Sequence, residues 1–330
     1  MKTWAGSIRA ATGALALVAG LATSGCLEFY AAPLEAPKDA TFVDVAGTHV
    51  HYVQAGDHGS TVVLIHGFAS STGVWATVMP ALSRDHRVIA IDLKGFGLTS
   101  RPEGDYSPDA QAQLVLGVLD KLGVDSSERV ALVAHSWGSS VALALTLRAP
   151  ERVARVALYD AWIYEDQLPN AFLWARAGGV GEAMIGMFYD ERSDEKMAGA
   201  FYDQRYVTEA LVETVEEQLA RPGTKAAALA AIRGQHFEAQ EAKYKTIEQP
   251  VLLLWGREDR VTTLEYGERL SKELADARLV VYPQCGHFPM IEAVRPSTRE
   301  LVRFLAEPDV APAQVKPAEP KEDPKPEVVE

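Results

Sequence analysis

One stretch at residues 130–140 limits most strongly what this chain can fold into: an apolar run that ends in one polar residue and then continues as an amphipathic segment. A strand followed directly by a helix places Ser136 on the sharp turn between them, beside the N–H groups that open the helix. Trp137 is then the first helical residue. Ala134 and Gly138 flank the turn, where strand and helix cross closely and a larger side chain would clash. The stretch predicts a nucleophile elbow that presents Ser136.

Strand and helix patterns alternate around this turn, which is typical of a doubly wound, mostly parallel sheet flanked by helices. Continuous β-branched runs indicate strands that are buried on both faces. The predicted strands are 41–46, 49–54, 61–65, 87–91, 130–135, 153–159, 250–255 and 278–282. The predicted helices of this part are 75–82, 107–122, 137–148, 264–274 and 296–306.

The alternation stops between residues 161 and 246, where only helical patterns occur. An all-helical insertion at this point of an α/β core predicts a cap over the carboxyl ends of the strands. Both ends of the chain are rich in proline and small or charged residues, which cannot bury a core. The predicted organisation is a leader (1–25), a linker (26–40), a core (41–160 and 247–306), the helical cap (161–246) and a disordered tail (307–330).

The leader has a basic start followed by an apolar run, Ala10 to Ala22, that is short for a membrane span. With Gly25 and Cys26 it resembles a bacterial lipoprotein signal peptide, in which the cysteine carries the lipid after cleavage. The resemblance implies an extracytoplasmic protein of the cell envelope, anchored to the membrane through Cys26. An ordinary cleaved leader and an uncleaved anchor remain alternatives. If Cys26 is acylated, Cys285, the one other cysteine, forms no disulfide; a Cys26–Cys285 bridge is the alternative.

Charge and composition exclude several functions. The net charge of −13 argues against a nucleic-acid partner, which requires a basic surface. We find no cluster of histidines and cysteines at the spacing of metal ligands, and therefore expect no metal and no cofactor. The expected partner is a small-molecule substrate.

Two further loops carry residues that would complete the chemistry of Ser136. Asp259 follows the strand at 250–255, and His287 follows the next strand along the chain. An imidazole can take the proton of a serine hydroxyl, and a carboxylate on its far nitrogen fixes the tautomer. Asp160 is a second candidate for the acid because it ends a strand at the same sheet edge. Glu258 is a weaker third.

The negative charge that develops on an attacked carbonyl needs N–H donors that are already in place. Trp137, directly after the serine, supplies one such group. Phe68 supplies the other, after a tight turn that Gly67 permits. His66 and Gly67 are candidates to touch the substrate pocket, as is Trp162 at the start of the insertion; for His66 a buried bracing role is the favoured interpretation.

Together these motifs resemble the α/β-hydrolase superfamily, with closest similarity to esterases and related hydrolases that carry a helical cap. The resemblance covers residues 41–306 and implies the α/β-hydrolase fold, with Ser136, Asp259 and His287 as catalytic triad. The motifs that carry it are His66-Gly67-Phe68, Asp92-Leu93-Lys94-Gly95-Phe96-Gly97, His135-Ser136-Trp137-Gly138, Gly256-Arg257-Glu258-Asp259 and Gly286-His287-Phe288.

The fold hosts many reactions, so the substrate has to be argued separately. A serine at the elbow argues against epoxide hydrolases and haloalkane dehalogenases, whose elbow residue is aspartate. The sequence favours hydrolysis of a carboxylic ester of small or medium acyl length through an acyl-enzyme. C–C bond hydrolysis, cofactor-free perhydrolysis or haloperoxidation, and a non-catalytic binding role are alternatives. The C–C alternative is weakened because residues 68–71 lack the Gly-rich loop often found in those enzymes.

Aromatic and methionine side chains of the insertion are candidates for an acyl pocket: Phe172, Trp174, Met184, Met187, Phe188 and Tyr189.

Overall fold

The computed structural model describes residues 27–309 and 327–328. The predicted leader and Cys26 lie outside these residues, as does most of the predicted tail. None of the described helices is long and apolar enough to cross a membrane.

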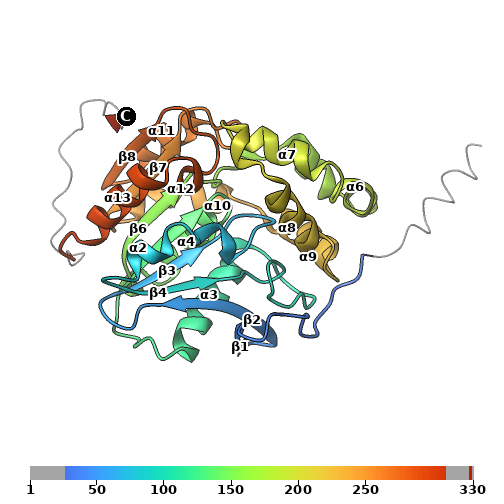
Figure 1. The fold of residues 1–330 in the computed structure, drawn as a ribbon, viewed down its shortest axis with the longest axis horizontal. Helices are drawn as coiled ribbons and strands as arrows, with labels where there is room; N and C mark the ends of the chain where they lie inside the picture. Colours follow the sequence, from blue (N-terminus) through green and yellow to red (C-terminus); the bar gives the residue numbers. More distant parts are fainter. Residues whose placement is uncertain (1–26, 310–326, 329–330) are drawn as a thin grey trace, which may run out of the picture.

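The described strands form one nine-stranded sheet with the order β1-β2-β4-β3-β5-β6-β7-β8-β9 (Figure 1). The pairs β1–β2 and β2–β4 are antiparallel, and all other neighbours are parallel. The mostly parallel sheet predicted from the sequence is therefore confirmed. The strands are β1 (Thr41–Val45), β2 (Thr48–Ala55), β3 (Thr61–Ile65), β4 (Arg87–Ile91), β5 (Val130–His135), β6 (Val153–Tyr159), β7 (Val251–Gly256), β8 (Ala277–Tyr282) and β9 (Glu327–Val328).

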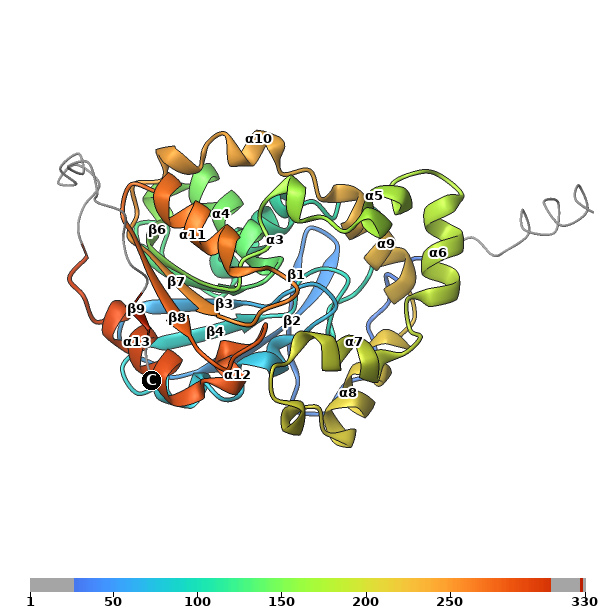
Figure 2. The ribbon, with the colours of Figure 1, turned by 90° about the horizontal axis from the view of Figure 1, so that it is seen from above.

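Helices cover both faces of the sheet, as Figure 2 shows from above. One face packs against α3 (Pro108–Lys121), α4 (Gly138–Arg148) and α11 (Leu264–Glu273). The other face packs against α2 (Met79–Leu82), α12 (Pro289–Glu292) and α13 (Val294–Leu305). The central strands β3 and β5 are buried along their whole length, because side chains on both faces pack into these two cores.

The insertion between β6 and β7 is helical, and its helices α5 to α9 lie beyond one end of the sheet, toward the right of Figure 2. It includes three short 3-10 turns. We call this segment the cap. Its α-helices are α5 (Asn170–Ala175), α6 (Val180–Phe188), α7 (Ser193–Ala200), α8 (Glu209–Leu219), α9 (Thr224–Gly234) and α10 (Glu238–Glu241).

The structure differs from the predicted elements in three places. The helix predicted over 75–82 is a 3-10 turn, Thr72–Trp75, followed by the short α2, because Pro80 is placed at the start of a helix and not in its interior. The last predicted helix begins earlier, at Val294, and a short α12 precedes it. Within the tail predicted to be disordered, β9 pairs with the edge strand β8.

The turn between β5 and α4 depends on a close approach of two backbones. A Cβ atom on Gly138 would lie 2.3 Å from the carbonyl oxygen of His66 and 2.7 Å from that of Ile65. Ser136 itself has a φ of 51°, a conformation that costs a residue with a side chain roughly 1–3 kcal/mol. The surrounding contacts must therefore hold the turn in place.

We predict that Gly138→Ala lowers the free energy of unfolding by about 1–3 kcal/mol, because the new methyl group overpacks against rigid backbone. Gly186→Ala is the matched control: nothing lies within 4 Å of the place that a Cβ atom would take at this position on α6. Alanine is also the better helix former there, so this control is expected to gain up to about 1 kcal/mol. Urea denaturation of both variants measures the difference, and equal stabilities would contradict the prediction.

Candidate active site

Ser136 is fixed at the end of β5 by its own backbone. Its N–H donates to the carbonyl of Tyr159 (2.9 Å), and its carbonyl accepts from the N–H of Trp162 (3.0 Å). Helix α4 begins at Gly138 with Trp137 as its N-cap, one residue later than predicted. Ser136 is 5% exposed, and Gly67 comes so close that a Cβ there would lie 2.9 Å from the Ser136 Cβ.

The structure brings Asp259 and His287 together. The Nδ1 atom of His287 lies 2.8 Å from Oδ2 of Asp259, and both side chains are buried. On its own, burial would raise the pKa of Asp259, but the His287 ring and the Thr262 hydroxyl bring it below its ordinary value. An ionised Asp259 on Nδ1 leaves Nε2 of His287 as the nitrogen that can exchange a proton with a serine.

His287 lies beside the residue that precedes the serine. Nε2 of His135 donates to the His287 carbonyl (2.8 Å), and the two rings are 4.7 Å apart. Burial, with the charge of His287 as a smaller cause, holds the pKa of His135 well below its ordinary value. A neutral His135 therefore supports the histidine loop without adding a competing charge.

Asp160, the second candidate acid, lies beside Asp259 but differs from it in hydrogen bonding and in protonation. Its Oδ1 accepts from the Gly256 N–H (2.9 Å), whereas its buried Oδ2 has no hydrogen-bond partner among the described residues. Burial and the nearby Asp259 carboxylate raise the pKa of Asp160 well above its ordinary value. A carboxyl that holds its proton cannot balance an imidazolium, so the geometry favours Asp259 as the acid.

Glu258, the third candidate, contacts a different part of the histidine loop. Its carboxylate accepts from the Cys285 N–H at 3.1 Å. Cys285 itself is buried and free of any disulfide to a described residue. Glu258 therefore braces the loop that carries His287.

The two proposed oxyanion donors are adjacent to the serine. Phe68 follows Gly67, and its ring lies 6.2 Å from that of Trp137 in an edge-on arrangement. Across residues 27–309, neither the Phe68 N–H nor the Trp137 N–H donates a hydrogen bond to another protein group. Both are thus free for a substrate oxygen.

His66 uses both of its ring nitrogens in the fold. Nε2 accepts from the Leu93 N–H (3.0 Å), so Nδ1 carries the proton and donates to the Gly67 carbonyl (2.7 Å). Burial lowers the pKa of this histidine. The contacts agree with a bracing role for His66. Trp162, the last pocket candidate, stacks on Phe172, with the ring centres 5.6 Å apart.

Sequence reasoning missed Thr262 and Glu292. The Thr262 hydroxyl lies 2.7 Å from Asp259 Oδ2 and 3.4 Å from His287 Nδ1, so it helps to fix the acid. Glu292 accepts from the Gly286 N–H (2.8 Å) and from the cap N–H groups of Tyr202 (2.8 Å) and Asp203 (3.0 Å). The threonine three residues after Asp259 was a possible signal, but nothing local marked Glu292.

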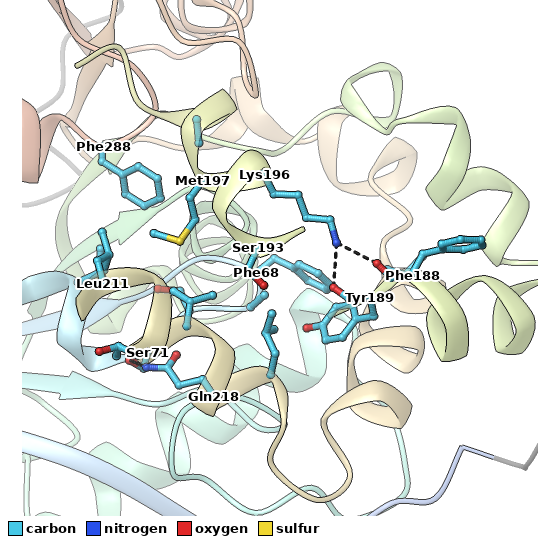
Figure 3. Close-up of a pocket in the computed structure, with 18 of the residues that line it drawn as sticks. Phe68, Ser71, Phe188, Tyr189, Ser193, Lys196, Met197, Leu211, Gln218 and Phe288 are labelled. Carbon is cyan, nitrogen blue, oxygen red and sulfur yellow. Dashed lines mark hydrogen bonds between the residues drawn. The ribbon is translucent and has the colours of Figure 1, made fainter. Parts of the chain in front are cut away.

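A cavity of about 620 Å³ lies between the cap and the core. Its lining is mostly apolar and includes Phe68, one of the proposed oxyanion donors, and Phe288, which directly follows His287 (Figure 3). Of the six candidate acyl-pocket residues, Phe172, Met184, Phe188 and Tyr189 line it. Trp174 and Met187 do not; they are 64% and 49% exposed.

Lys196 is the only charged side chain among the described residues that line this cavity. Its ammonium group donates to the carbonyls of Phe188 (2.9 Å) and Tyr189 (3.0 Å), as the dashed lines in Figure 3 show. An ammonium has three donor hydrogens, so one remains for a ligand.

One group of side chains in the described part of the chain has the composition of a cation site. Ligand atoms of Asp160, Asp259 and His287 all lie within 4.8 Å of one another. Asp259 and His287 already bind each other there, and Thr262 contacts the same carboxylate oxygen. The arrangement therefore fits a hydrogen-bonded triad better than a metal site.

Comparison with known proteins identifies the family. Residues 60–294 match the family model described as alpha/beta hydrolase fold. The chain belongs to this family.

Two curated relatives of this α/β hydrolase are similar over nearly their whole length. The 2-hydroxy-6-oxo-2,4-heptadienoate hydrolase of Pseudomonas putida is 33% identical over 286 residues, which is 79% of this chain and 94% of the relative. The 2-hydroxymuconate semialdehyde hydrolase of a Pseudomonas species is 30% identical, over 85% of this chain and 98% of the relative. The crystal structure of a meta-cleavage product hydrolase from Pseudomonas fluorescens is 29% identical with a TM-score of 0.66, over 80% of this chain and 96% of that one.

We predict that a fluorophosphonate probe labels the hydrolase and that Ser136→Ala abolishes the labelling, because the probe reacts with an activated serine. Ser139→Ala, three residues further on in α4 and fully buried, is the matched control and should label normally. In-gel fluorescence measures both. Persistent labelling of Ser136→Ala would refute the nucleophile, and an unlabelled but folded wild type would favour a non-catalytic role.

We predict that Asp259→Asn lowers kcat by about 10⁴-fold, because an amide on Nδ1 favours the wrong imidazole tautomer. Asp160→Asn should lower kcat by less than about tenfold, since asparagine is also neutral and keeps the acceptor for the Gly256 N–H. Steady-state kinetics with the same substrate compares the two. A near-normal Asp259→Asn enzyme would contradict our assignment of the acid.

Proposed function

We propose that this α/β hydrolase cleaves a carbon–carbon bond beside a ketone, in a 2-hydroxy-6-oxo-dienoate of the kind that its relative is named for. The similarity over 94% of that relative, at 33% identity, carries the proposal. This similarity supports the C–C alternative better than the ester hydrolysis that the sequence favoured first. Residues 68–71 lack the Gly-rich loop that is often found in C–C hydrolases. The C–C proposal does not need that loop, because Phe68 still presents a free N–H for the oxyanion.

In the proposed mechanism, Ser136 Oγ adds to the ketone carbonyl while His287 takes the hydroxyl proton. The N–H groups of Phe68 and Trp137 stabilise the oxyanion. The bond to the neighbouring carbon then breaks, its electron pair stays on that carbon within the conjugated system, and the carbon receives the proton. Water activated by His287 hydrolyses the acyl-enzyme, which releases a carboxylic acid and restores the serine, with Asp259 stabilising the imidazolium.

Lys196 is the residue that we propose for the substrate carboxylate. A dienoate is an anion, and an anion in an apolar cavity requires a cationic or hydrogen-bonding partner. Lys196 is the one charged side chain of the described lining and keeps one donor after its two backbone contacts. The rest of the cavity suits the uncharged part of the substrate.

Ester hydrolysis is the second candidate function. The observation that favours it is the apolar lining, dominated by side chains such as Phe172, Met184, Ile185 and Leu211. An acyl chain would fill such a cavity without the help of Lys196. The same triad would form the acyl-enzyme.

We expect turnover of a 2-hydroxy-6-oxo-2,4-dienoate to exceed turnover of p-nitrophenyl esters of any acyl length. Loss of the absorbance of the dienoate chromophore measures its turnover. Lys196→Gln should lower kcat/KM for the dienoate by about 10- to 100-fold, the value of one hydrogen bond to a charged group. The same variant should hydrolyse the neutral esters as the wild type does, which controls for folding. Ester turnover without dienoate turnover would overturn the C–C proposal and leave the ester as the substrate.

We also propose that the protein is lipid-anchored through Cys26 and faces away from the cytoplasm. The apolar run from Ala10 to Ala22 followed by Gly25 and Cys26 supports this. If this is correct, Cys26→Ser should move the protein from the membrane fraction to the soluble fraction.

A further inference from the structure

The outward surface of α5 and α6 is unusually apolar for a protein of net charge −13. Its exposed side chains are Leu173 and Trp174 on α5 and Val180, Met187 and Phe188 on α6. We call these five residues the apolar face. Large apolar side chains grouped in this way mark a contact with another molecule or a membrane.

Charges are nearly absent from this part of the cap. Between Asn170 and Phe188 only Arg176 and Glu182 are charged. Arg176 pairs with Glu165, and Glu182 pairs with Arg233 on α9. Since both charges are neutralised by the rest of the protein, they do not oppose transfer of the apolar face into lipid.

Helix α6 lacks the polar stripe of an ordinary surface helix. Gly181 and Ile185 face the protein, and Val180, Met187 and Phe188 recur on the exposed side. A helix that is apolar on both sides is usually buried on both sides. In the described structure, one side of α6 has no cover.

The first described residue, Leu27, lies next to α6. Leu27 packs against the cluster formed by Ile185 of α6 and by Leu229 and Ile232 of α9. Three residues further on, Tyr30 exchanges two backbone hydrogen bonds with Arg101 (2.9 and 2.8 Å). These bonds hold the segment that leads from Leu27 to Tyr30 against the core. Cys26 directly precedes Leu27, so a lipid on Cys26 would be held within one residue of the cap.

We propose that the apolar face is a membrane-docking surface, which lies in the interfacial layer of the bilayer to which Cys26 is attached. The proposal rests on the proposed lipid anchor for its geometry but not on the substrate. Trp174 is suited to that layer, because its ring is apolar and its N–H can meet polar headgroups. The acidic protein gains no attraction from anionic lipid, so the contact is apolar rather than electrostatic.

The docking surface and the cavity lie on opposite sides of the same two helices. Phe172 and Met184 line the cavity from the same two helices that carry Trp174 and Met187 on the outside. Helices α5 and α6 thus form a single wall between the cavity and the proposed bilayer.

Tryptophan fluorescence tests the proposal without any assay of activity. The full chain carrying Trp4→Phe is mixed with phosphatidylcholine vesicles, with or without bromine atoms on the acyl chains, which quench nearby tryptophans. The described tryptophans other than Trp174 are buried, so they are poor targets for the quencher. We expect bromolipid to quench the emission, and the quenching to disappear when Trp174→Phe is added.

Two controls separate docking from other causes. Val53→Ser, on the exposed side of β2, should leave the quenching unchanged, whereas Met187→Ser should reduce it. The quenching should be equal at low and at molar salt, because apolar contacts are not screened.

Protein that floats with the vesicles but shows no quenching dependent on Trp174 would overturn the proposal. In that case, shielding of Trp174 from soluble acrylamide would mean that the leader or a second copy of the chain covers the apolar face. Quenching that vanishes at molar salt would overturn the apolar mode of docking. None of these outcomes depends on which substrate the enzyme hydrolyses.

Discussion

The close crossing of the α4 start over the end of β3 is the constraint on which the rest of the site depends. Gly138 leaves room for the His66 and Ile65 carbonyls, and Gly67 leaves room for the Ser136 side chain. Phe68 follows Gly67 and Trp137 precedes Gly138, so both proposed oxyanion donors belong to the segments that cross here. The strained φ of Ser136 is stable only because backbone hydrogen bonds to Tyr159 and Trp162 hold the residue on both sides.

A second buried group holds the loops around this crossing. Asp92, at the end of β4, accepts from the N–H groups of Thr72 (2.6 Å) and Leu98 (2.8 Å) and from His51 Nδ1 (2.7 Å). Burial by itself would raise the pKa of Asp92, but the hydrogen bonds from His51 and from the Leu98 N–H bring it below its ordinary value. One carboxylate therefore ties three segments to the sheet edge, and a Cβ on Gly97 would have no room beside it.

The sequence predicted the parallel strands and the helical insertion well, because each depends on a local pattern. It also placed Asp259 and His287 close together, because both follow strands that end at the same edge of a parallel sheet. It did not predict Glu292 as a support, because the partners of Glu292 are brought close only by the fold, and it missed Thr262, which lies three residues after Asp259. It also did not distinguish Met184, which lines the cavity, from Met187, which is exposed. Helix α6 is apolar on both sides, so its sequence pattern does not show which side is buried. Pro80 was a local signal for the interrupted helix near Trp75.

Glu292 joins the loop of His287 to the cap. Its carboxylate binds Gly286 on one side and Tyr202 and Asp203 on the other, and the His287 N–H donates to the carbonyl of Ala200 (2.8 Å) at the end of α7. The cap therefore contacts the loop of His287 directly, through the end of α7 and the two residues Tyr202 and Asp203. A displacement of this end of α7 would therefore also displace the loop that aims the general base, so that one set of hydrogen bonds serves both the cap and the chemistry.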